Sequence, residues 1–224
     1  MALDGKCAKC PFNMNEKKCS VPDGRSPKFC STDIYKNAVE KANSLIAQDP
    51  ALKEFARQAA LQEASCYVPA DSGSDALRPV KSRIQETIEL CGRMGYHRIG
   101  LAFCLGLNRE AAALNAILES CGLEVVSVAC KVGCTDKSFI GMAREETIRK
   151  GPHESMCNPI AQAMVLNDAH TEFNLMLGLC VGHDSMFIKY SDAPVTVVAV
   201  KDRLLGNNPI AALYSGYYGY LLRK

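Results

Sequence analysis

Short apolar runs alternate with helical patterns over residues 96–224. The runs RIGLAF, LEVVSVA, EFNLMLGL and VTVVAV predict four strands, over residues 98–103, 123–129, 172–179 and 195–200. Between them, helices are predicted over residues 109–121 and from the Asn158–Pro159 pair to about Asp168. Near-continuous apolar strands separated by helices are typical of a parallel sheet covered on both faces. We therefore predict an α/β fold for residues 95–224, a Rossmann-like layered domain with a mainly parallel sheet of about four strands.

Residues 33–94 show helical periodicity instead. Apolar residues follow one helix face from Ile34 to Ile46, and Asp49 before Pro50 is a typical start for the next helix. A third pattern runs from Val80 to Cys91, where Gly92 or Gly95 can end it. We predict a helical segment that packs on the core.

Residues 1–32 hold four cysteines but little apolar periodicity. Prolines and a glycine break the chain repeatedly, so this segment reads as loop and cannot build a hydrophobic core of its own. A bound metal is the obvious means of holding it. We predict a Cys-rich metal-binding segment that precedes the helical segment.

Charge and composition exclude several classes of function. The 26 basic and 24 acidic side chains leave a net charge of +2, and there is no tryptophan, so nothing indicates a nucleic-acid partner. No signal peptide is recognisable, and no apolar run approaches the roughly 18 residues of a membrane span. We therefore expect a cytoplasmic protein with no membrane partner. Disulfides are rare in that compartment, so twelve cysteines point toward metal binding or catalysis.

Three cysteines follow predicted strands directly. Cys104, Cys130 and Cys180 come after the first, second and third strand. Ligands of open parallel sheets bind outside the carboxyl ends of the strands, so these thiols are candidate metal ligands. Cys134, four residues after Cys130, and Cys157, at the start of a predicted helix, are further candidates.

The alternative is that cysteines only fill space, because free cysteine is often buried. We favour that interpretation for Cys66, Cys91 and Cys121, the last two in Cys-Gly pairs at predicted helix ends. Clustered thiolates suit zinc, copper(I) or iron–sulfur clusters.

The amino-terminal cysteines form a second candidate site. Cys7 and Cys10 make a C-x2-C pair, and Cys19 and Cys30 complete four thiols. Four thiolates satisfy structural zinc or an iron–sulfur cluster equally well, and the spacing matches neither a zinc ribbon nor a ferredoxin. The pattern thus predicts a metal without identifying it.

His183 and Asp184 follow Cys180 at the expected start of a helix. His183 is a candidate for binding metal or moving protons, and Asp184 for orienting that imidazole. The alternative for both is an ordinary turn.

Four motifs together resemble a known family. The amino-terminal C-x2-C, the ACKVGC segment, the CNPIAQA helix start and the GLCVGHD turn are similar to a prokaryotic family of unknown function described as predicted metal-binding proteins. The resemblance covers most of the chain. It implies metal binding and no established reaction.

These observations favour a protein with one or two iron–sulfur clusters, of the 4Fe-4S type. A cluster with an open iron would act as a Lewis acid on a small-molecule substrate, whereas a closed one would exchange electrons with a redox partner. The main alternative is a non-enzymatic zinc protein with a structural or redox-sensing role. A thiol–disulfide oxidoreductase using Cys7 and Cys10 is weaker, because no strand precedes that pair.

Overall fold

The structure is a computed structural model that describes residues 4–71 and 76–218. The chain divides into two compact units, residues 1–61 and 62–224. The segment boundaries predicted after residues 32 and 94 stay predictions.

The first unit is made of turns and helices. Two 3-10 turns, η1 (Cys7–Lys9) and η2 (Met14–Glu16), precede the helices α1 (Ser31–Ile34) and α2 (Lys36–Gln48). Helix α3 (Pro50–Ala64) begins in this unit. The carboxylate of Asp49 accepts hydrogen bonds from the amides of Ala51 and Leu52 at 2.9 and 3.0 Å, which confirms the predicted helix start.

The second unit opens with a hairpin and a helix. Strands β1 (Tyr67–Pro69) and β2 (Leu77–Pro79) pair in antiparallel fashion, in a region for which no strand was predicted. Three-residue strands are too short to show an alternating pattern in the sequence. Helix α4 (Arg83–Met94) ends at Gly95, whose φ of +71° is the left-handed conformation that glycine adopts easily.

The main sheet confirms the predicted α/β fold. Its strands β3 (Arg98–Phe103), β4 (Glu124–Ala129), β5 (Phe173–Leu177) and β6 (Val195–Ala199) are all parallel and lie in the order β4-β3-β5-β6. Every residue of β5 is buried, as its unbroken apolar run suggests.

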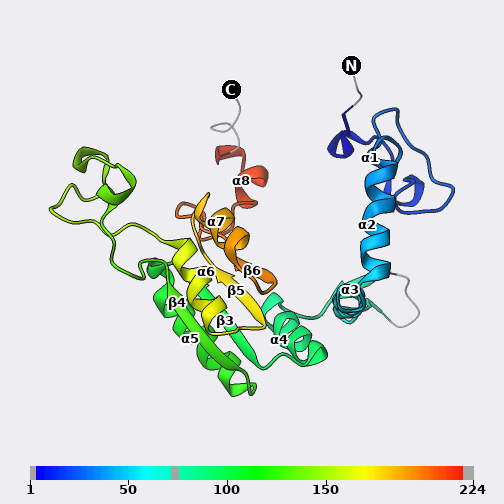
Figure 1. Cartoon of the computed structure of the whole chain (residues 1–224). Coiled ribbons are helices and arrows are strands. Elements are labelled where there is room, and N and C mark those ends of the chain that lie inside the picture. The colour runs from blue at the N-terminus through cyan, green and yellow to red at the C-terminus, as the bar shows by residue number, and fades with distance from the viewer. Residues whose placement is uncertain (1–3, 72–75, 219–224) are drawn as a thin grey trace. The chain divides into compact units, whose positions relative to one another are not determined.

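Helices cover both faces of this sheet. α5 (Asn108–Ser120) packs on one face, while α6 (Pro159–Asp168) and α7 (His183–Tyr190) pack on the other (Figure 1). On the α6 side, Leu166 and Phe187 close a core over Ala102, Val128 and Met176 of the strands. A short helix, α8 (Ala211–Tyr214), follows the sheet.

A long connection leaves the carboxyl end of β4 and returns at α6. Its two arms are joined by hydrogen bonds from the Met156 amide to the Thr135 carbonyl at 2.8 Å and from the Lys137 amide to the Glu154 carbonyl at 3.0 Å. Between the arms lie the 3-10 turns η4 (Lys137–Ile140) and η5 (Arg144–Glu146), and a third such turn, η3 (Leu105–Leu107), joins β3 to α5. The arms therefore bring residues 154–158 beside residues 130–137.

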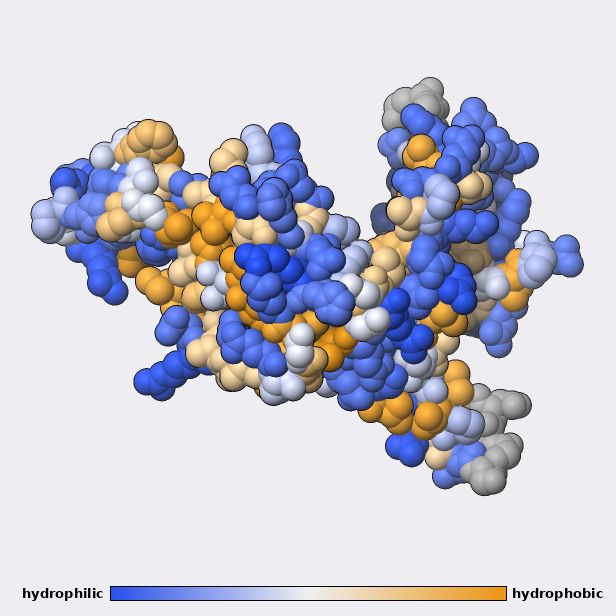
Figure 2. Space-filling model, turned by 60° about the horizontal axis from the view of Figure 1, so that its bottom comes forward, coloured by the Kyte–Doolittle hydropathy of each residue, from blue (hydrophilic) through white to orange (hydrophobic). Residues whose placement is uncertain are grey.

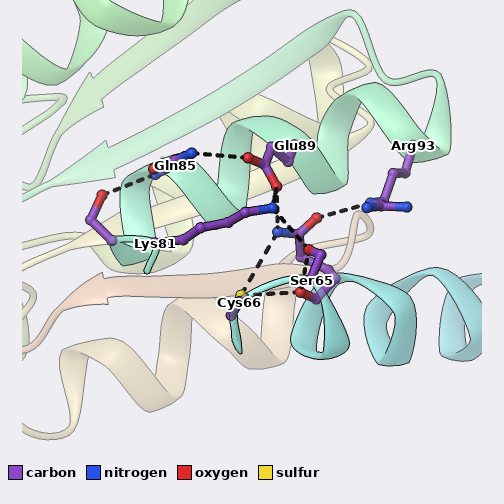
Figure 3. A network of polar contacts seen from close by, with 8 residues as sticks. Ser65, Cys66, Lys81, Gln85, Glu89 and Arg93 are labelled. Atoms are coloured by element: carbon purple, nitrogen blue, oxygen red, sulfur yellow. Dashed lines mark hydrogen bonds and ion pairs between the residues drawn. The ribbon is translucent and has the colours of Figure 1, made fainter. Parts of the chain in front are cut away.

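A partly buried polar network joins the last turn of α3 to α4. The amide of Gln62, 4% exposed, donates to the Glu89 carboxylate at 2.8 Å and accepts from Arg93 Nε at 2.9 Å (Figure 3). Lys81 forms an ion pair with the same carboxylate at 2.5 Å. These contacts hold Gln62 of α3 to helix α4.

Hydrophobic and hydrophilic residues are interspersed over the face drawn in Figure 2. Among the helices of the described residues, none combines the length and the apolar character needed to cross a membrane.

Candidate thiolate metal centre

The sheet order defines where a ligand is expected. The chain passes from β3 to β4 on one side, then returns past β3 to β5 and β6 on the other. Its direction thus reverses between β3 and β5, and the carboxyl ends of these two strands flank the crevice where open α/β sheets bind ligands. Cys104 directly follows β3, and Cys180 lies three residues after β5.

Three of the predicted thiols meet at this edge. A hydrogen bond of 2.7 Å from the Asn158 amide to the Cys130 carbonyl brings the start of α6 against the end of β4. The sulfurs of Cys130 and Cys157 consequently lie 3.7 Å apart. Cys104 hydrogen-bonds to Cys130, whose sulfur also accepts from the Leu105 amide at 3.4 Å. We call Cys104, Cys130 and Cys157 the thiol cluster.

The three thiols of the cluster differ in the direction in which their pKa values are shifted. The hydrogen bond that joins the sulfurs of Cys157 and Cys130, helped by the charge of Lys131, lowers the pKa of Cys157 to about 7. The bond to Cys130 and burial raise the pKa of Cys104 far above its usual value. Cys104 acts to lower the pKa of Cys130, but the bond to Cys157 and burial outweigh it and the pKa rises. Cys157 is therefore the cluster thiol that ionises first.

Cys180 lies near the cluster but in a different contact. Arg203 Nη2 donates to its sulfur at 3.1 Å. The charge of Cys180 acts to raise the pKa of Cys157, so these two thiols are close enough to interact electrostatically. The Cys180 carbonyl also accepts from the amides of His183 and Asp184, which starts helix α7 as predicted.

His183 and Asp184 occupy the first turn of α7. Burial, helped by the charges of neighbouring lysines and Arg203, lowers the pKa of His183. The Asp184 carboxylate accepts a hydrogen bond from the Ser185 amide at 2.8 Å. Their roles beside a metal stay predictions.

Cys134 belongs to a separate group on the long connection. Its sulfur lies 3.6 Å from His153 Nε2 and 3.3 Å from Ser155 Oγ. On the other side of the ring, His153 Nδ1 lies 3.1 Å from the Asp136 carboxylate. Cys134 has a φ of +51°, a left-handed conformation that is uncommon outside glycine and asparagine. The structure thus brings Cys134 to a histidine and a carboxylate.

The four amino-terminal thiols line one cavity within the first unit. Its volume is about 130 Å³, and its walls include Cys7, Cys10, Cys19 and Cys30. The turn η1 bonds the Cys10 amide to the Cys7 carbonyl at 3.0 Å, which sets the C-x2-C pair on one turn. Hydrogen bonding by Ser31, whose hydroxyl lies 3.1 Å from the sulfur, lowers the pKa of the Cys7 thiol.

One pair of thiols has the spacing expected of two ligands on a single metal ion. Within residues 4–71 and 76–218, no three His, Cys, Asp or Glu side chains are placed so that they could hold a metal ion together. Two thiolates on one tetrahedral zinc, at Zn–S distances of about 2.3 Å, would lie roughly 3.8 Å apart. The 3.7 Å between Cys130 and Cys157 matches that separation, so one pair already has ligand spacing.

Of the three cysteines that we expected to fill space, two are buried and one is exposed. Cys66 and Cys91 are buried, and burial raises the pKa of both thiols, in Cys91 to about 11. Cys121 is exposed, so the expectation that it packs under its helix end is wrong. The chain turns at the adjacent Gly122, with a φ of +83°, directly after α5, and this leaves Cys121 on the surface.

Sequence reasoning missed the charged partners of this edge. Lys201 follows β6 just as the cysteines follow the other strands, and this position was the available signal. Arg203 and His153 carried no such signal, because their contacts join segments 23 and 19 residues apart.

The fold and this edge define a cysteine-rich α/β protein with a parallel sheet. The chain belongs to a family described as "Protein of unknown function (DUF1847)", whose sequence model matches residues 30–198. It is 40% identical over 213 residues to the uncharacterized protein MJ0455 of Methanocaldococcus jannaschii, and the match covers 95% of each chain. No solved structure matches the chain. The expected membership in a family of unknown function is confirmed, and metal binding stays a proposal.

Proposed function

We propose that this protein binds a metal through cysteine thiolates at the carboxyl edge of its sheet, with Cys104, Cys130 and Cys157 as ligands and an iron–sulfur cluster as the group held there. The observation that carries the proposal is that thiols from three separate segments of the chain, those that follow β3 and β4 and the one that precedes α6, meet at one sheet edge. Hydrophobic packing alone would not require cysteine at all three positions.

The donor set favours a thiophilic metal. The thiol cluster consists of sulfur alone, and soft thiolate ligands select zinc, copper(I) and iron–sulfur clusters. The lowered pKa of Cys157 supports the proposal because the thiolate is the form that binds metal. The proposal includes a reducing, cytoplasmic setting, because ligand cysteines must stay reduced.

Three ligands leave room for chemistry. A cluster held by three thiolates would supply a Lewis-acidic iron to a small molecule in the crevice. Cys180 is the available fourth ligand, because it lies at the same edge and is held by Arg203. If it also binds, the closed shell suits electron transfer to a redox partner instead.

Zinc is the second candidate, and a specific observation favours it. The 3.7 Å separation of Cys130 and Cys157 equals the edge of a tetrahedron around one ion, whereas thiolates on different irons of a cluster lie farther apart. A zinc ion at this edge would need less side-chain rotation than a cluster.

The amino-terminal cavity is the proposed second site. Cys7, Cys10, Cys19 and Cys30 surround it, and Lys17, Lys18 and Arg25 in the same walls would offset the charge of four thiolates. Binding there would hold a segment that has little apolar material of its own.

Composition analysis of the purified protein tests the proposal. The full chain is purified without oxygen, its visible spectrum is recorded, and iron, acid-labile sulfide and zinc are measured per chain. Iron with equimolar sulfide and a coloured product support the cluster, and colourless protein with stoichiometric zinc supports the second candidate. Protein without bound metal, before and after anaerobic reconstitution with iron and sulfide or with zinc, would overturn both.

A further inference from the structure

A large cavity adjoins the thiol cluster. Its volume is about 720 Å³, and Cys104 lies in its wall. Loop residues after β3, β4 and β6 and the returning arm of the long connection supply the rest of the lining. A volume of this size is typical of sites for small molecules.

The lining of this cavity is strongly basic. Four of its residues are cations: Lys131, Arg149, Lys201 and Arg203. Its one carboxylate, Glu154, forms an ion pair with Lys137 and accepts from the Arg149 amide at 2.8 Å. Because the whole chain carries a net charge of only +2, this is a local concentration of positive charge.

The four cations differ in whether their side chains donate hydrogen bonds to neighbouring atoms. Lys131 donates to the Ser155 carbonyl, and Arg203 donates to the Cys180 sulfur. Among the described residues, no carboxylate lies within ion-pair distance of any of the four, and the side chains of Lys201 and Arg149 also donate no hydrogen bond. Lysine and arginine with unpaired donors in a concave site are typical of oxyanion recognition.

Cys104 and Lys201 approach the same part of the chain at Gly106. A Cβ atom on Gly106 would lie 3.8 Å from Cys104 Sγ and 3.9 Å from Lys201 Nζ. Cys104 Sγ and Lys201 Nζ therefore both lie within 4 Å of the same point beside Gly106. The charge of Lys201 already acts on Cys104.

We propose that this cavity binds a small molecule through an oxyanion group, a phosphate or a carboxylate, with Lys201 and Arg149 as the main contacts. The molecule would then face the metal centre beside Cys104, and this second step rests on the proposed function. The competing explanation is that the cations only balance the negative charge of the thiolates. That explanation predicts no saturable binding of added anions.

Calorimetric titration of the full chain separates the two explanations. Inorganic phosphate and succinate are titrated in separate experiments at low salt, and the stronger of the two identifies the oxyanion class. We expect saturable binding that weakens as sodium chloride is added. Lys201→Gln and Arg149→Gln should each weaken it about tenfold or more, because each removes a hydrogen bond between charged groups.

Matched variants keep the test decisive. Lys201→Arg should retain most of the binding, and Arg78→Gln, on the exposed strand β2, should leave it unchanged. Circular dichroism confirms that each variant is folded. Binding that does not saturate for either anion, or that Arg78→Gln weakens as much as Lys201→Gln, would overturn the inference.

Metal content measured on the same samples distinguishes the two proposals. Saturable, Lys201-dependent binding to protein that takes up no metal would refute the metal centre and keep the anion site. Bound metal without saturable anion binding would refute the anion site and keep the metal centre.

Discussion

Glu89 connects three side chains of the partly buried network between α3 and α4, and its ionisation is tied to folding. The ion pair with Lys81, followed by hydrogen bonds from Gln62 and Gln85, lowers the pKa of Glu89 to about 2. In an unfolded chain a glutamate has a pKa of about 4.3. The contribution of this carboxylate to stability is therefore complete above that value and disappears as the pH falls toward 2.

The Glu89→Gln variant should reveal this dependence. We expect urea unfolding to show a stability deficit, relative to the unchanged chain, that is constant near neutral pH and shrinks as the pH falls from about 4.3 toward about 2. The exposed Glu63→Gln provides the control and should show no such trend. A deficit that stays constant across this range would contradict the assignment.

Cys134 should react differently from the other exposed thiols. His153 Nε2 lies 3.6 Å from the Cys134 sulfur and the Asp136 carboxylate contacts the other side of the ring, so the imidazole is held beside the thiol that iodoacetamide attacks. We expect His153→Ala to slow alkylation of Cys134 by iodoacetamide several-fold, as followed by peptide mass spectrometry. The exposed Cys121 in the same samples is the internal reference, and equal slowing at both thiols would contradict the prediction.

At the scale of elements, the turn after β5 depends on a glycine. Gly178 has a φ of +66°, and a Cβ atom there would lie 2.1 Å from Leu107 Cδ1, a buried side chain. Gly178→Ala should therefore destabilise the protein by about 1–3 kcal/mol in urea unfolding.

Gly92 in α4 offers the matched comparison. A Cβ atom there meets nothing within 4 Å, so Gly92→Ala should stabilise the protein by up to about 1 kcal/mol. If Gly178→Ala, like Gly92→Ala, did not lower the free energy of unfolding, the turn after β5 would tolerate a side chain and the prediction would be wrong.

The elements themselves were largely predictable, because their signals are local. The four apolar runs became β3 to β6 with boundaries within two residues, and the Asn158–Pro159 pair does begin α6. The hairpin of β1 and β2 was missed, because its three-residue strands are stabilised by pairing with each other.

The candidate site was only partly predictable, for a related reason. The strand-end positions of Cys104 and Cys130 are visible in the sequence, but their contact with Cys157 depends on a hydrogen bond across 28 residues, from Asn158 to Cys130. The separation of Cys134 from these thiols depends on how the long connection folds back, which no local pattern reports.

At the scale of the whole molecule, the twelve cysteines form groups with different surroundings. The amino-terminal four line a cavity in residues 1–61, whereas the thiol cluster lies at the sheet edge of residues 62–224. The two proposed metal sites use separate parts of the chain. Loss of one set of ligands should therefore leave the other site filled.

The most direct test of the thiolate metal centre is metal per chain in cysteine variants of the full protein, purified or reconstituted without oxygen. Cys130→Ala and Cys157→Ala should each lose the metal of the sheet edge while keeping that of the Cys7–Cys30 site. Cys121→Ala, which changes an exposed thiol outside both sites, should keep all of it. Full metal content in both the Cys130→Ala and the Cys157→Ala proteins would contradict the account.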